Sequence, residues 1–126
     1  MQIQDHLDQL LNDAPGCRLA TFGDLSSGLI LKWSAPSPCP REVLDQLSEQ
    51  SAGCFALLDP ALLPEGIPAP EYGQAVMTFT DRATRVFARS AGAPDDIVGA
   101  VFAPQTDAHT ALSLTREAAE KLAGPQ

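Results

Sequence analysis

The sequence predicts an α+β fold in which a five-stranded antiparallel sheet carries helices on both faces, in the order αββαβββα. Three observations lead to this prediction. A helical apolar stripe precedes two strand-like segments, a second striped segment precedes three more, and a long striped helix closes the chain.

Length and composition place the chain among ordinary globular proteins. Its 126 residues are predicted to form one domain, residues 1–126. The net charge of −8 argues against a nucleic acid or an anionic membrane surface as partner. No signal peptide or membrane-spanning run is visible, and the three cysteines have no CxxC spacing. These features predict a cytoplasmic protein.

The first half of the chain predicts a helix, two strands and a second helix. Apolar residues at helical spacing run from Ile3 to Ala14, where Pro15 and Gly16 end the helix. Residues 17–22 and 29–33 are strand-like and joined by a Gly/Asp/Ser turn. The second helix is expected over residues 41–52, with Gly53 closing it, and residues 54–58 either extend it or form a short irregular piece. Four prolines in residues 59–73 predict a long loop.

The second half predicts three strands and the closing helix. The strands are expected at residues 74–80, 84–89 and 97–103. The last is apolar at every position, which is typical of a central strand covered on both faces. Its small residues Gly99 and Ala100 favour close approach of a helix. Asp107 is a good N-cap for the final helix, and Lys121 in its last turn suits the helix dipole.

The residues that carry chemistry do not form a recognisable catalytic or metal-binding pattern. His6 and His109 are far apart in sequence and have no cysteine pair beside them, so we predict no metal, no cofactor and no enzymatic activity. Arg85 and Arg89 are expected on a solvated strand face, the alternative being contact with an anion or acidic partner. Trp33 is expected in the core.

Two segments resemble the roadblock/LC7 family, whose relatives have profilin-like and longin-like folds. Residues 16–22 together with 28–31 are similar to the first hairpin of that family. The apolar residues 97–102 running into a long final helix also resemble it. The resemblance implies the strand order second, first, fifth, fourth, third, with the first and last helices on one face. It also implies a non-enzymatic dimer that acts as a scaffold or as a regulator of small Ras-like GTPases.

A homodimer interface is predicted on the second helix and the third strand. Residues 74–80 contain no charge and no proline, and soluble proteins usually protect an edge strand with such residues. The opposite edge carries Lys32. The predicted interface residues are Val43, Leu44, Leu47, Val76, Thr78 and Thr80. The loop 59–73 folding over this edge is the alternative.

A second functional hypothesis is a small-molecule sensor. In this hypothesis a pocket lies between the sheet and the second helix, and the loop 59–73 caps it. A sensor should have a deep pocket with convergent polar groups, whereas a scaffold should not.

Overall fold

The elements follow the predicted order αββαβββα. A computed structural model of the chain describes residues 2–57 and 74–123, so the predicted loop 59–73 lies outside the described residues. The elements are α1 (Ile3–Asp13), β1 (Cys17–Asp24), β2 (Leu29–Ser34), α2 (Arg41–Ala56), β3 (Gln74–Phe79), β4 (Thr84–Ser90), β5 (Ala93–Phe102) and α3 (Ala108–Leu122). No helix in this described part is long and apolar enough to cross a membrane.

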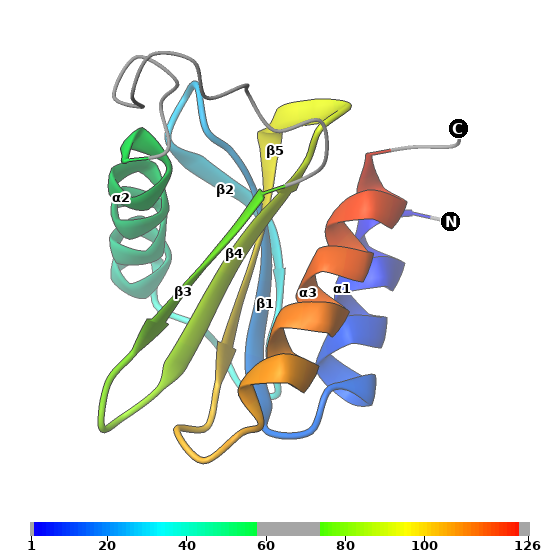
Figure 1. The fold of residues 1–126 in the computed structure, drawn as a ribbon, viewed down its shortest axis with the longest axis vertical. Coiled ribbons are helices and arrows are strands. Elements are labelled where there is room, and N and C mark those ends of the chain that lie inside the picture. Colours follow the sequence, from blue (N-terminus) through cyan, green and yellow to red (C-terminus); the bar gives the residue numbers. More distant parts are fainter. Residues whose placement is uncertain (1, 58–73, 124–126) are drawn as a thin grey trace, which may run out of the picture.

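The five strands form one antiparallel sheet in the order β2-β1-β5-β4-β3. This is the predicted order, and β5 is central as its apolar sequence indicated. Figure 1 shows α1 and α3 side by side on one face of the sheet and α2 on the other. The predicted distribution of helices is therefore also confirmed.

Two apolar clusters fill the layers on either side of the sheet. Between the sheet and α1/α3 the core includes Leu7, Val86, Val98 and Phe102. Between the sheet and α2 it includes Leu19, Ile30, Leu44, Leu47, Phe55, Phe87 and Ile97. Alternating residues of β4 and β5 enter the two clusters, as the two-residue period of a strand requires.

The end of α2 and the start of β5 differ most from the sequence prediction. The helix α2 continues through Gly53 to Ala56, because Phe55 packs into the core with 3% exposure. Burial of that ring outweighs the cost of about 1 kcal/mol for a helical glycine. The strand β5 begins at Ala93, before Ile97. Pro94 is tolerated there because it lies near the strand end, where a missing N–H costs little.

The cap prediction for α3 is confirmed, whereas the prediction for Trp33 is wrong. The Asp107 carboxylate accepts the Thr110 backbone N–H at 2.9 Å and so caps α3. Trp33 is 38% exposed together with Leu29 and Leu31. These three residues belong to β2, an edge strand whose outer side meets no strand of the described chain.

Candidate interaction surface

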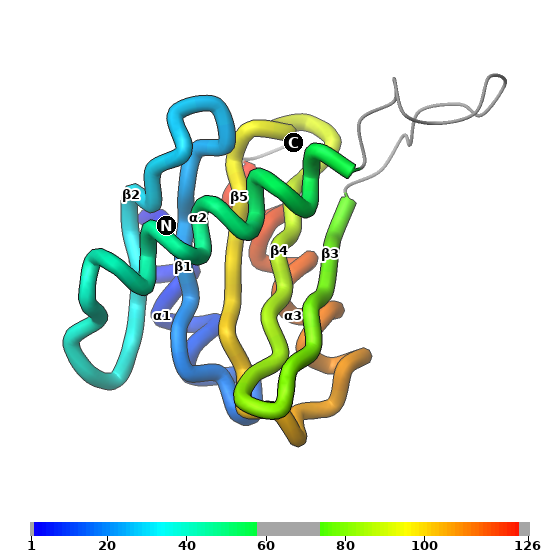
Figure 2. Tube along the Cα trace, turned by 90° about the vertical axis from the view of Figure 1, so that its left-hand side faces the viewer, coloured from blue at the N-terminus to red at the C-terminus, as the bar shows by residue number. Residues whose placement is uncertain are grey.

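The outer edge of β3 is the clearest candidate for contact with another chain. In the described part of the chain β3 pairs with β4 on one side, in the register Gln74↔Arg89 to Phe79↔Thr84, and ends the sheet on the other. An edge strand presents N–H and C=O groups that its own sheet leaves unpaired. Figure 2 shows β3 at the border of the sheet, with α2 crossing in front of the strands.

The predicted β3 residues have different surroundings. Val76 is half-buried against the cluster beneath α2. Thr78 shares that face, since it pairs with Arg85, and its Oγ1 is buried without a hydrogen-bond partner among the described residues. Thr80 lies just beyond β3, where its hydroxyl oxygen accepts the N–H groups of Arg82 and Ala83 in a turn.

The predicted α2 residues divide between core and surface. Leu44 is fully buried and Leu47 is 2% exposed, and both pack against the sheet. Val43 is 37% exposed. Of the three, therefore, Val43 is the residue exposed on the surface of α2, while Leu44 and Leu47 hold the helix on the sheet. The interface as a whole stays a prediction.

Arg85 and Arg89, expected on a solvated face, instead connect β4 to α2. Arg85 Nη1 donates to Gln50 Oε1 at 2.7 Å. The Arg89 guanidinium lies over the ring of Phe55, 4.5 Å from its centroid, and Arg89 Nε donates to Gln74 Oε1 at 2.9 Å. Desolvation lowers the pKa of Arg89, partly offset by Asp95. The prediction of a solvated face was therefore wrong. Phe87, between the two arginines, was the sequence signal for a covered face.

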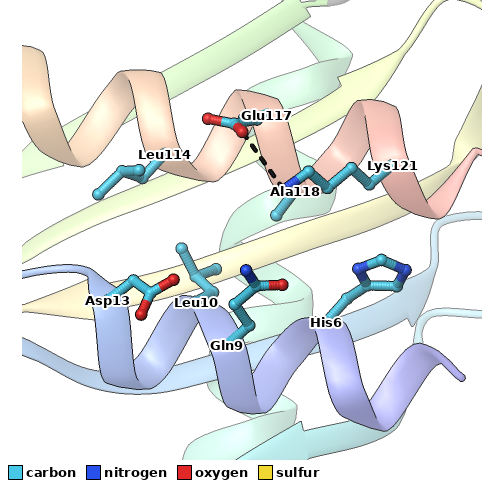
Figure 3. A pocket seen from close by; sticks show the side chains of 8 residues that line it. All are labelled: His6, Gln9, Leu10, Asp13, Leu114, Glu117, Ala118 and Lys121. Carbon is cyan, nitrogen blue, oxygen red and sulfur yellow. Dashed lines mark ion pairs between the residues drawn. The ribbon is translucent and has the colours of Figure 1, made fainter. Parts of the chain in front are cut away.

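A groove of about 100 Å³ lies between α1 and α3, on the other side of the sheet (Figure 3). Its floor consists of Leu10, Leu114 and Ala118, and its rim of His6, Gln9, Asp13, Glu117 and Lys121. Lys121 Nζ lies 3.3 Å from Glu117 Oε1, so the ammonium of this rim is already paired. His6 Nδ1 is buried without a partner among the described residues. His109 belongs to the first turn of α3, so the fold does not bring the two histidines together.

The space between α2 and the sheet is small. Its volume is about 10 Å³, among residues that include Thr21, Ser48, Ser51 and Phe87. A space of this size holds about one water molecule. The described residues therefore provide no metabolite-sized pocket there, and the proposed cap at 59–73 lies outside them. This observation favours the interaction hypothesis over the sensor hypothesis.

The thiols of Cys17 and Cys39 are not activated as nucleophiles. Burial raises the pKa of the Cys17 thiol to about 11, and burial also raises the pKa of the Cys39 thiol. A reactive cysteine requires the opposite shift. Among the described residues, no three His, Cys, Asp or Glu side chains are grouped so as to hold a metal ion.

The sheet order, with α2 on one face and α1 and α3 on the other, defines the roadblock/LC7 class of fold. Solved structures agree with this assignment. The gliding protein MglB from Thermus thermophilus has 20% identity and a TM-score of 0.68, over 98% of this chain and 90% of that chain. A roadblock/LC7 domain from Streptomyces avermitilis has 14% identity and a TM-score of 0.65, over 98% and 92%.

Profilin II from Acanthamoeba castellanii is similar too, with 16% identity and a TM-score of 0.61 over 98% of both chains. The resemblance found in the sequence is thus confirmed for the fold. No family model matches the sequence, and no curated protein matches it.

Proposed function

We propose that this chain is a non-catalytic interaction module that forms a homodimer and acts as a scaffold or regulator. Residues 1–126 would form a single domain of the roadblock/LC7 type, acting in the cytoplasm. Its dimer interface would combine the β3 edge with the exposed side of α2. The partner class that the fold resemblance implies is a small Ras-like GTPase.

The observation that carries the proposal is the unprotected edge of β3. The strand has no charged residue and no proline, and its outer side meets no strand of the described chain. Antiparallel pairing of two copies would continue the sheet across a twofold axis. Val43 is exposed on the side of the sheet that α2 covers, and the Thr78 hydroxyl on that side has no hydrogen-bond partner among the described residues.

Sedimentation velocity at micromolar concentration tests the dimer. The wild type should sediment as a dimer, and Val76→Lys should sediment as a folded monomer, because a charge beside the seam opposes pairing. Thr78→Lys is the second variant, since Thr78 is not one of the apolar residues of the cluster beneath α2. Leu31→Lys, on the opposite edge strand, is the matched control and should remain dimeric. A monomeric wild type, or a dimer unaffected by both β3 variants, would contradict the proposed interface.

Calorimetric titration tests the partner class. Small Ras-like GTPases of the source organism would be titrated into the protein in their GDP-bound and GTP-analogue-bound states. Regulation requires that affinity differ between the two nucleotide states, since a ligand shifts an equilibrium only by its differential affinity. Equal affinity for both states would leave a scaffold role, and absence of binding would refute the GTPase assignment.

A further inference from the structure

The outer edge of β2 carries side-chain hydrogen bonds on its backbone carbonyls. Ser48 Oγ donates at 2.7 Å to the carbonyl oxygen of Gly28, the turn residue that precedes β2. Arg41 Nη1 donates to Ile30 O at 3.3 Å. Gln4 Nε2 donates to Trp33 O at 3.0 Å. The donors come from α2 and α1, while β1 occupies the other side of β2.

The carbonyls of Ile30 and Trp33 form one row along β2, whereas that of Gly28 belongs to the turn just before the strand. Carbonyls on the same side of a strand recur every two residues. The interval from Ile30 to Trp33 is three residues, and the register of β2 against β1 shifts there, with Phe22 opposite Lys32 and Gly23 opposite Ile30. Leu31 is thus the extra residue of a β-bulge. Once it is counted, the carbonyl of Trp33 falls in the same outward row.

Further contacts hold the donors in place. Gln4 Nε2 also donates to Asp8 Oδ1 at 3.1 Å, and Ser34 Oγ donates to the same carboxylate oxygen at 2.6 Å. Arg41 Nε lies 3.3 Å from Asp45 Oδ1. Ser48 is buried, with 8% exposure. The donors therefore lose little extra freedom when they cap the strand.

Although this edge carries Lys32, most of its exposed side chains would favour association. Leu29, Leu31 and Trp33 are all exposed, and an apolar edge strand recruits other chains. We propose that Gln4, Arg41 and Ser48 close the β2 edge to strand addition. An incoming strand would have to displace these donors before its own N–H groups could reach the carbonyls. If the chain dimerises through β3, as proposed above, the closed β2 edges end the sheet at two copies.

The test removes the donors in the variant Gln4→Ala/Arg41→Ala/Ser48→Ala. All three positions lie on helices, where alanine is well tolerated. The control is Gln9→Ala/Arg82→Ala/Ser113→Ala, which removes the same residue types and the same charge from exposed positions. Sedimentation velocity over a concentration series should give species larger than the wild type for the first variant, and the wild-type distribution for the control. A folded triple variant with the wild-type distribution would overturn the inference.

Two further arms keep the test decisive. If circular dichroism shows the triple variant to be unfolded, Gln4→Ala/Arg41→Ala replaces it, because neither of those residues is buried and the buried Ser48 is kept. The inference is also separable from the proposed dimer. If the wild type is a monomer, the proposed β3 dimer fails, yet loss of the caps should still raise the mass through β2.

Discussion

Val101 lies directly across the β4–β5 ladder from Arg85, and both side chains are on the sheet face that α2 covers. Val98 points to the opposite face, where it is 1% exposed in the cluster beneath α1 and α3. The two valines of the same apolar strand therefore have different surroundings. One is enclosed by hydrocarbon, and the other is half-buried beside a guanidinium.

Aspartate substitutions should separate these two positions. Val98→Asp would place an ionised carboxylate in the core without a partner, and we expect a loss of more than about 4 kcal/mol in the free energy of unfolding. The carboxylate of Val101→Asp would face Arg85. Its loss in the free energy of unfolding should therefore be smaller than that of Val98→Asp by at least about 1 kcal/mol. Denaturant melts at pH 7 measure both. Equal losses would show that the two faces of β5 are alike.

Arg89 should contribute to stability although it is a charged strand residue. Arg89→Ala removes the contact with Phe55 and the hydrogen bonds to Gln74, and we expect a loss of about 1–2 kcal/mol. Arg89→Lys keeps the positive charge but lacks the planar guanidinium, so it should retain only part of the stability that Arg89→Ala loses. The control Arg82→Ala, at an exposed turn, should stay within about 0.5 kcal/mol. Chemical denaturation that finds Arg89→Ala as silent as Arg82→Ala would contradict the stacking.

The sequence predicted the order of elements because hydrophobic periodicity depends on near neighbours. The fully apolar segment 97–103 identified the central strand for the same reason. Partners distant in sequence were not predictable. The hydrogen bond from Gln4 to the carbonyl of Trp33 depends on the position of α1 relative to the edge of the sheet. The helical stripe on α2 located Leu44 and Leu47, but an apolar residue there can face the sheet or a second chain. Leu44 and Leu47 are buried, which shows that they face the sheet.

Asp8 should make stability fall at acid pH. Hydrogen bonds from Ser34 and then Gln4 lower the pKa of this carboxyl below its ordinary value of 3.8, against a smaller effect of desolvation. The depressed pKa means that its contribution is present above about pH 4 and is lost as the pH falls through the folded-state value. The wild type should therefore exceed Asp8→Ala in stability at pH 7, and the difference should shrink below pH 4 in urea melts. A difference that grows on acidification would contradict this linkage.

Asp96 should have the opposite effect from Asp8 on the pH dependence of stability. Desolvation, Asp24 opposite it in the β1–β5 ladder, and Asp95 raise the pKa of Asp96. Its ionised form is therefore disfavoured in the folded state, and this penalty is present at neutral pH and disappears as the pH falls through the raised pKa. Asp96→Asn should stabilise the protein at pH 7 by about 0.2–1 kcal/mol. Thermal melts from pH 7 to pH 3 should show the advantage fading. A destabilised Asp96→Asn would mean that the carboxylate has a favourable partner.

Alanine substitution should have opposite effects on stability at two glycines, Gly99 and Gly53. A Cβ at Gly99 would lie 2.6 Å from Thr21 Oγ1 and 3.2 Å from Phe87 Cδ1. Both neighbours are 2% exposed, so neither can move aside easily, and Gly99→Ala should cost about 1–3 kcal/mol. A Cβ at Gly53 would meet nothing within 4 Å. Because Gly53 lies inside α2, Gly53→Ala should stabilise by up to about 1 kcal/mol.

A double-mutant cycle identifies the cause of the Gly99 effect. The residue belongs to the most central strand, and its absent side chain makes room for cross-strand neighbours, in place of the close helix approach that the sequence predicted. Thr21→Ala removes the hydroxyl that a Cβ at Gly99 would meet, together with its 3.3 Å bond to Gly99 O. Thr21→Ala/Gly99→Ala should therefore lose less than the sum of the single variants. Strict additivity in denaturant melts would show that the Thr21 hydroxyl is not what excludes a side chain at Gly99.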